Sequence, residues 1–375
     1  MTSSFQPFTS PAQEAALPLH LPAEFEARIA ALWVFPIKSC AGISVQQALL
    51  TPTGLAHDRA WMVVDADGEM VTQRELPRMA LIQPELVGSD AGLVELVLHA
   101  SGMAALHLPL TADGRFMQAA HQPASTEPPA SLSKPYPPET RAIHVRVWGD
   151  QVPAFDMGDE ASAWLTEFLG SSSGPLRLVH FDENHHRPSS AKWTQGLPSL
   201  NQFSDGFPVL VASTASLDEL NARLQAKGEA AVDMRRFRVN VVLGHADAMP
   251  TLQASAPANA SANASASAHA INAHDEDRIG TITIHAQADN DAVGVGVGVG
   301  EAVQLQPVKP CPRCPIPNID PDSAQSHPAV NDTLQAYRQD PRVNGALTFG
   351  MNCLPVAGIG QVLRVGQRVS ADWAF

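Results

Sequence analysis

The chain has 375 residues and is 45% apolar, and its 24 Lys and Arg against 38 Asp and Glu give a net charge of −14. This length and apolar content predict two or three domains with sizeable cores. The negative charge argues against a protein that stably binds nucleic acid or an anionic membrane, because both partners need a general basic face. Any positively charged site must therefore be local.

The sequence predicts neither a membrane anchor nor an export signal. No run of about 18 apolar residues is present, as a transmembrane helix would need. Residues 1–27 lack the basic and apolar regions of a secretory signal, so we expect a mobile tail there. Four cysteines are too few for a disulfide scaffold of this length. We therefore expect a reducing cytoplasm as the compartment.

Short strand-like segments separated by turns fill the first part of the chain. They cover residues 28–36, 43–50, 61–64, 92–98 and 105–108, with turn chemistry at 65–68, a return strand at 69–73 and a further strand at 141–148. A Pro-, Ser- and Thr-rich stretch at 122–140 predicts an exposed loop. We expect a small antiparallel β-barrel-like domain over residues 28–155.

The remaining residues, 156–375, predict a second, mainly β domain with a few short helices. Helices are expected at 158–169, 217–224 and 332–339, and strands at 176–181, 208–212, 237–243, 278–286, 302–308, 346–351 and 362–369. An Ala-, Ser-, Asn- and His-rich tract at 251–274 and a Val-Gly repeat at 293–300 predict a low-complexity insertion between residues 250 and 300. Long insertions cost little closure entropy, so we expect an expanded loop there.

The densest chemical motif is the proline-rich segment 310–322, which carries Cys311 and Cys314 as a C-x2-C pair. Three readings of this pair compete. In the first, the pair is half of a zinc site, which would need two more ligands. In the second, it is a thioredoxin-like dithiol, which would need a following helix that the four prolines of this segment disfavour. In the third, one thiolate binds a soft metal, and the adjacent Arg313 favours the charged form of the thiol. Two structural cysteines in a stiff loop are the plain alternative.

Basic and hydroxyl side chains at three other places are candidate anion-binding groups. Lys38 and Ser39 follow a strand that stops at a proline, and Arg59 lies in an Asp-Arg pair. Free N–H groups and hydroxyls gather where residues 213–216 open a helix, although an ordinary helix cap explains them equally well. The alternation of Arg236, Arg238 and Asn240 predicts that these three share one strand face.

In this order, these segments resemble the MOSC proteins that carry an N-terminal β-barrel domain. That group includes the mitochondrial amidoxime-reducing components and the bacterial YcbX-type proteins. The resemblance is carried by FPIKSCAGISV (35–45), DRAWMVVDADGEMVTQRELPRMALI (58–82), FPVLVASTASLDELNARL (207–224), RRFRVNVVL (235–243) and VKPCPRCPIPNIDPDS (308–323). It implies a mainly β (α+β) fold in which an N-terminal β-barrel-like domain and a MOSC β-barrel hold a molybdenum–molybdopterin cofactor between them.

The resemblance also implies which residues bind that cofactor. Cys314 matches the molybdenum ligand and hence the catalytic position. The other matching positions are Lys38, Ser39 and Arg59 from the N-terminal side, and Ser213, Thr214, Ser216, Arg238, Asn240 and Arg313 from the MOSC side. A soft thiolate suits the metal, and basic and hydroxyl groups suit a phosphate on the pterin.

By the same resemblance, the chain is expected to be a molybdenum-dependent oxidoreductase that reduces N-hydroxylated compounds such as amidoximes, hydroxylamines and N-hydroxylated bases. Electrons are expected from a separate ferredoxin or flavin-linked reductase, since no second redox module is encoded within these residues. The alternative is a non-redox cofactor carrier or sulfuration-related module. Against this alternative, the sequence shows no pyridoxal-phosphate desulfurase domain. Residues 315–318, Pro-Ile-Pro-Asn, depart from the family pattern beside the metal.

Overall fold

The structure, a computed structural model, describes residues 25–89, 92–110, 141–170, 174–245, 271–286 and 301–374. Strands dominate and helices are few and short, so the expected mainly β fold is confirmed. The proline-rich loop at 122–140, the Val-Gly repeat, and most of the tail and of the Ala/Ser/Asn tract lie outside the described residues. In the described part of the chain, no helix has both the length and the apolar character needed to cross a membrane.

Seven strands close into a barrel. Their order around it is β14 (Val209–Ser213), β15 (Val241–His245), β1 (Phe25–Val34), β21 (Arg368–Trp373), β16 (Ile279–Ile284), β17 (Val303–Pro312) and β19 (Ala346–Ala357), which pairs again with β14. Apolar side chains of these strands fill the interior, and Ile29, Val211, Leu243, Ile282 and Leu305 are fully buried there. Closure leaves these strands without free hydrogen-bonding edges.

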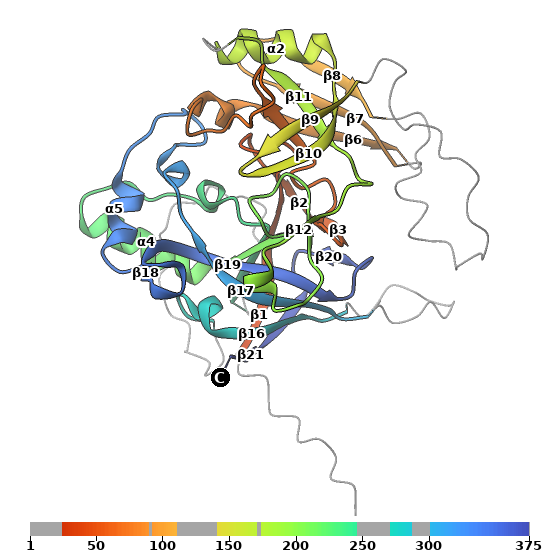
Figure 1. The fold of residues 1–375 in the computed structure, drawn as a ribbon. Helices are drawn as coiled ribbons and strands as arrows, with labels where there is room; N and C mark the ends of the chain where they lie inside the picture. Colours follow the sequence, from red (N-terminus) through yellow and green to blue (C-terminus); the bar gives the residue numbers. More distant parts are fainter. Residues whose placement is uncertain are drawn as a thin grey trace, which may run out of the picture.

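A second group of strands lies above the barrel (Figure 1). One sheet has the order β5 (Trp61–Val64), β11 (Arg177–Phe181), β10 (Asp150–Asp156) and β9 (Ala142–Val147), and another has β6 (Gln83–Ser89), β7 (Gly92–His99) and β8 (Leu106–Pro109). Helix α2 (Asp159–Leu169) buries Trp164, Leu165 and Phe168 in the core that these sheets share. The helix ends at Gly170, whose left-handed φ of 66° suits glycine.

The remaining elements are short strands and three helices, of which α4 has 13 residues. They are β2 (Ile43–Val45), β3 (Gln47–Thr51), β4 (Gly54–Leu55), β12 (Arg187–Pro188), β13 (Leu200–Asn201), β18 (Gln339–Asp340), β20 (Val362–Arg364), α3 (Ala191–Thr194), α4 (Thr214–Ala226) and α5 (Ala329–Gln335). Five 3-10 turns complete the described elements: η1 (Pro77–Leu81), η2 (Met234–Phe237), η3 (Asp275–Arg278), η4 (Ile316–Asn318) and η5 (Pro341–Val343).

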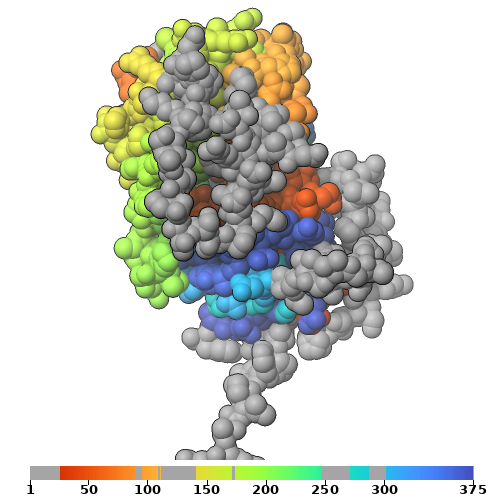
Figure 2. Space-filling model, turned by 90° about the vertical axis from the view of Figure 1, so that its right-hand side faces the viewer, coloured from red at the N-terminus to blue at the C-terminus, as the bar shows by residue number. Residues whose placement is uncertain are grey.

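The chain crosses between the two groups of strands more than once. Strand β1 pairs with β15 and β21 in the barrel although it precedes every strand of the upper sheets, and β3 pairs with β20. In the space-filling view, the orange-red N-terminal segment accordingly lies against the blue C-terminal strands (Figure 2). Conversely, β11 pairs with β5 and β10. The predicted domain ranges, 28–155 and 156–375, stay a prediction. Strands from one range pair with strands from the other, as β1 does with β21 and β5 does with β11.

Several expected elements differ from the structure for local reasons. The expected strand 237–243 is wrong at its start, because residues 234–237 form η2 and Arg238 has a left-handed φ of 55°. The expected strand 362–369 is broken into β20 and β21 by a turn in which Gly366 has a φ of 86°. The expected return strand at 69–73 is reduced to single bridges, one of them between Val64 and Met70. Strand β1 begins at Phe25, within the expected tail.

Candidate functional site

A basic cavity of about 450 Å³ opens between the barrel and the upper sheets. Among the residues that the structure describes, seven Lys or Arg side chains line it, and Asp205 is the one acidic side chain in its lining. The basic residues are Lys38, Arg59, Arg74, Arg236, Arg238, Lys309 and Arg313. On a chain of net charge −14, this concentration of positive charge favours an anionic ligand.

Cys314 lines the cavity from the loop that follows β17. The loop is fixed on both sides of the cysteine: Arg313 N donates to Leu347 O at 2.8 Å, and Asn331 Nδ2 donates to Cys314 O at 3.3 Å. Among the described residues, no group of three His, Cys, Asp or Glu side chains is placed to hold a metal ion, which disfavours the zinc reading. After the pair comes only the three-residue turn η4, which disfavours the dithiol reading.

Cys311 lines the same cavity from the end of β17. Burial raises the pKa of its thiol, which favours the neutral form of Cys311. Cys314 sits on the loop beyond the strand, and both cysteines are partly exposed. Both line the cavity, so the choice of Cys314 as the candidate ligand for a soft metal rests on the sequence resemblance.

Lys38 and Ser39 enter the cavity from the segment that follows β1. The segment is held against β5, because Lys38 N donates to Trp61 O at 2.8 Å, and Gln73 Nε2 donates to Ser39 O at 2.7 Å. The Lys38 ammonium donates to Phe203 O at 2.8 Å and pairs with the Asp205 carboxylate. Burial lowers the pKa of Lys38, and Asp205 opposes that shift. This buried lysine is therefore held at the cavity by one largely exposed carboxylate.

Arg59 and Arg238 form the most concentrated positive charge of the site. Both have left-handed backbones, with φ values of 52° and 55°. Arg59 Nη1 pairs with Asp58, and Arg238 Nη1 donates to Cys40 O at 2.5 Å. Burial and the nearby Arg59 charge lower the pKa of Arg238 to about 9. Two like charges held in this way favour an anion between or beside them.

Arg313 and Asn240 belong to the cavity wall, and both are committed to main-chain carbonyls or amides. Arg313 Nε donates to Phe349 O and its Nη1 to Phe237 O, each at 3.0 Å. Asn240 Nδ2 donates to Trp33 O at 3.2 Å, and Asn240 Oδ1 accepts from Leu210 N at 3.1 Å. Both residues thereby fix the wall around Cys314.

Ser213, Thr214 and Ser216 do not line the cavity. Ser213 caps α4 by accepting from Ser216 N at 3.1 Å, and both hydroxyls donate to the buried Glu276 carboxylate, at 3.0 and 2.6 Å. The segment therefore has the geometry of an ordinary helix N-cap, which is the second explanation that the sequence offered. These three residues therefore lie outside the candidate site.

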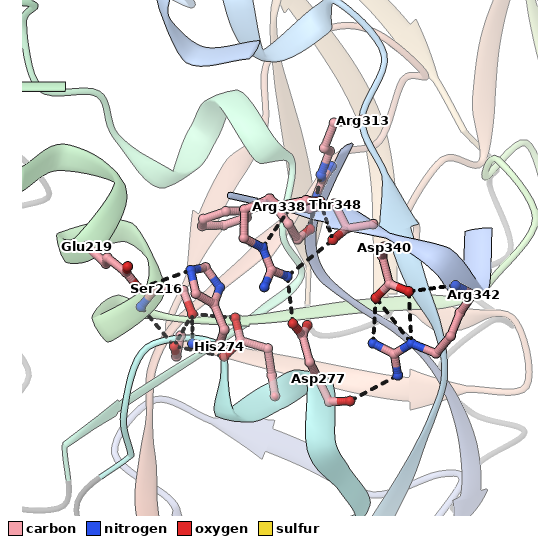
Figure 3. A network of polar contacts seen from close by, with 12 residues as sticks. Ser216, Glu219, His274, Asp277, Arg313, Arg338, Asp340, Arg342 and Thr348 are labelled. Carbon is pink, nitrogen blue, oxygen red and sulfur yellow. Dashed lines mark hydrogen bonds and ion pairs between the residues drawn. The ribbon is translucent and has the colours of Figure 1, made fainter. Parts of the chain in front are cut away.

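The cap belongs to a polar network that reaches the wall of the cavity (Figure 3). His274 N donates to Ser216 Oγ at 2.8 Å, and in the next turn of chain, η3, Asp277 pairs with Arg338 at 2.6 Å. Arg338 Nε then donates to Thr348 O at 3.1 Å. The following residue of β19, Phe349, is the acceptor of the Arg313 hydrogen bond. The network thus ties η3 to the strand that positions Arg313.

The structure brings together seven of the ten sequence candidates and adds others that the motifs missed. The seven are Lys38, Ser39, Arg59, Arg238, Asn240, Arg313 and Cys314. The additions include Arg74, Trp148, Asp205 and Lys309, which come from separate loops and strands. Arg236 also lines the cavity, from η2 and not from the strand face expected for it. No spacing in the sequence links these residues.

Two family models match the chain. The MOSC N-terminal beta barrel domain matches residues 26–172, and the MOSC domain matches residues 198–370. The chain therefore belongs to the MOSC-domain proteins that carry an N-terminal MOSC β-barrel domain.

Three curated relatives show the range of similar proteins. The mitochondrial amidoxime-reducing component 1 of Mus musculus is 35% identical over 222 residues, which are 57% of this chain and 55% of that protein. The mitochondrial amidoxime reducing component 2 of Rattus norvegicus is 29% identical over 358 residues, 91% of this chain and 82% of the relative. The molybdenum cofactor sulfurase of Danio rerio is 37% identical over 148 residues, 40% of this chain and 15% of the relative. The chain spans little more than half the length of the mouse protein.

Proposed function

We propose that the basic cavity binds a molybdenum–pterin cofactor, with the Cys314 thiolate as the metal ligand. One observation carries this proposal: a partly exposed cysteine on a fixed loop shares a cavity with seven basic side chains. A thiolate is the kind of ligand that a soft metal centre takes. Lys38, Arg59 and Arg238 would hold the pterin phosphate, since guanidinium and ammonium groups bind phosphate through charge-assisted hydrogen bonds.

We infer further that the loaded protein reduces N-hydroxylated compounds. Two relatives are named amidoxime-reducing components, and this supports the reaction class. The reaction takes two electrons and two protons: the N–O bond breaks, the nitrogen is reduced to the amine or amidine, and the oxygen leaves as water. When bound, the cofactor supplies the site where this two-electron reduction occurs. This chain's residues anchor the cofactor, and a separate electron donor, a ferredoxin or a flavin-linked reductase, supplies the electrons.

We place the protein in the cytoplasm, in line with its four free thiols. The names of the amidoxime-reducing relatives make the mitochondrion the competing compartment. Fractionation of cells that express the untagged chain decides between the two.

Metal analysis of the purified protein tests the cofactor proposal. Wild-type protein is expected to hold molybdenum and pterin in equal amounts, close to one per chain, and Cys314→Ala is expected to lose the metal. Cys311→Ala is the matched control, because Cys311 lines the same cavity. This variant protein is expected to keep the metal. Equal metal content in the wild type and the Cys314 variant would contradict the proposal.

Substrate turnover tests the reaction class. Loaded protein is expected to reduce benzamidoxime with reduced methyl viologen as the electron donor. The second candidate is a non-redox cofactor carrier, which the similarity to a molybdenum cofactor sulfurase favours. Protein that holds stoichiometric cofactor, is inert toward benzamidoxime and passes its cofactor to an apo-molybdoenzyme would establish the carrier.

A further inference from the structure

Trp148 has an unusual backbone conformation at the tip of a hairpin. Trp148 and Gly149 are the two loop residues between β9 and β10, since Val147 and Asp150 are paired across the turn. Trp148 has a φ of 57°, whereas Gly149 is not among the glycines with positive φ. A positive φ at the first loop residue of such a hairpin is typical of glycine, and for a bulky side chain it is strained. Trp148 therefore occupies a backbone conformation that favours glycine.

The strained tryptophan lies at the cavity that contains Cys314. It lines that cavity and is nevertheless 45% exposed. Trp148 Nε1 donates to Asp205 Oδ1 at 3.1 Å, which is the carboxylate that pairs with Lys38. The Arg74 guanidinium lies 4.5 Å from the centroid of the indole ring. The ring is thus fixed by a hydrogen bond at its edge and a cation–π contact, while nearly half of the residue stays open to solvent.

We propose that Trp148 is a specificity-determining residue whose exposed ring stacks on the planar part of an N-hydroxylated substrate. This proposal rests on the proposed function and names a preference within it: aryl and heteroaryl substrates over saturated ones. A fixed aromatic face attracts a second planar π-system, and stacking is tolerant of the exact ring. Three charged side chains, Arg74, Lys38 and Asp205, lie against the ring, so the indole supplies an apolar surface beside them.

The backbone strain separates this role from a structural one. If Trp148 served only to make the turn, glycine would serve better, because it adopts positive φ without steric cost. Trp148→Gly is therefore expected to fold with a melting temperature at or above that of the wild type. It is also expected to keep the wild-type molybdenum content, since the cofactor ligands proposed above are untouched.

Kinetics with matched substrates test the preference. We compare wild type, Trp148→Phe, Trp148→Ala and Trp148→Gly on benzamidoxime and acetamidoxime, with reduced methyl viologen as donor. The ratio of kcat/KM for benzamidoxime to that for acetamidoxime is expected to fall about tenfold in the Ala and Gly variants, the size of effect that loss of one stacking contact gives. The Phe variant is expected to restore most of the ratio.

Equilibrium binding gives a readout that does not depend on turnover. Titration calorimetry is expected to show benzamidoxime binding about tenfold more weakly to the Gly variant than to wild type. If wild type reduces neither substrate, the proposed function fails, and this titration still decides the stacking proposal. A Gly variant with wild-type selectivity and affinity would overturn it. So would loss of molybdenum in the Gly variant, which would assign the ring to the binding of the cofactor.

Discussion

Arg59 Nη2 donates a hydrogen bond to the main-chain carbonyl of Arg238 at 2.9 Å, and both guanidinium groups lie against one aromatic ring. Their Cζ atoms are 4.6 and 4.4 Å from the centroid of Phe35, which is almost fully buried. The ring and the hydrogen bond offset part of the repulsion between the two cations. The buried Asp58 carboxylate pairs with Arg59 and neutralises part of the charge, while the guanidinium of Arg238 donates hydrogen bonds to main-chain carbonyls. The remaining positive charge makes this pair a candidate binding place for a phosphate.

Pyrophosphate is expected to stabilise cofactor-free wild-type protein and to stabilise Arg238→Gln much less. At a ligand concentration ten times the dissociation constant, binding to the folded state alone adds about 1.4 kcal/mol to the free energy of unfolding. Thermal melts with and without pyrophosphate measure this gain. Arg146→Gln is the matched control, because Arg146 is an exposed arginine that pairs with Glu69. An equal gain in wild type and Arg238→Gln would show that the anion binds elsewhere.

The residues expected from sequence motifs and the residues that line the cavity coincide at some positions and differ at others. Lys38, Cys314 and Arg238 lie within the segments that carried the family resemblance, and they line one cavity. Ser213 and Ser216 lie within such a segment too, but the pattern of a helix start says nothing about which buried carboxylate its hydroxyls meet. Helix α2 was predicted closely because its apolar residues follow a strong helical period.

Other parts of the site had no signal in the sequence. Trp148 donates a hydrogen bond to Asp205, which lies 57 residues further along the chain, and no local sequence pattern predicts this contact. Arg238 was expected on a strand because it alternates with apolar residues, but its left-handed backbone ends η2 and delays the strand to Val241. That backbone turn is what lets Arg238 reach Cys40 O. The departures from regular structure thus lie where the cavity is built.

Gly42→Ala is expected to destabilise the protein and disturb the arginine cluster. A Cβ atom at Gly42 would lie 2.4 Å from Phe35 Cε1, and Phe35 is too tightly packed to move freely. Overpacking of this kind costs about 1–3 kcal/mol. Urea denaturation measures the loss, and molybdenum content is expected to fall with it. Gly149→Ala is the control, because a Cβ there meets no atom within 4 Å. Equal stability of the two variants would contradict the close contact.

Arg338→Met is expected to destabilise the protein far more than Arg342→Met. The Arg338 and Asp277 side chains are 10% and 12% exposed, so the variant leaves a poorly hydrated carboxylate without its ion-pair partner. Breaking a buried pair from one side costs about 3–5 kcal/mol. The Arg342 side chain is 45% exposed, and its pair with Asp340 is expected to contribute about 0–1 kcal/mol. Chemical denaturation of both variants checks the difference, and similar losses would argue against it.

Arg338 also donates a hydrogen bond to Thr348 O, so Arg338→Met also tests whether this polar network supports the cavity wall at Arg313. Loss of Arg338 is expected to loosen the β19 segment whose next residue, Phe349, accepts from Arg313. Hydrogen exchange at the Arg313 amide, which donates to Leu347 O, reports this loosening. Exchange that is unchanged in Arg338→Met would restrict the network of Figure 3 to a role in stability.

Glu276→Gln is expected to remove a pH dependence of stability between about pH 4.5 and 7. Burial raises the pKa of Glu276 from 4.5 to about 7, against the hydrogen bonds from Ser216 and Ser213. The folded state therefore binds the proton more tightly than the unfolded state. The stabilisation is complete below the unfolded pKa and is lost as pH rises through the folded pKa. Over this interval the free energy of unfolding is expected to fall by roughly 3 kcal/mol.

Glutamine keeps the shape and one oxygen that accepts from a serine hydroxyl, while its NH2 group donates to the other serine oxygen, and the amide has no proton to lose. Urea denaturation at several pH values from 4.5 to 8 is therefore expected to give wild-type and Glu276→Gln curves that diverge as pH rises, with the variant relatively more stable at the alkaline end. Titrating groups distant from Glu276 contribute equally to both proteins, so the difference between the curves reports Glu276 together with its coupling to Asp277. A constant offset between wild type and Glu276→Gln would mean that this carboxyl titrates normally despite its burial.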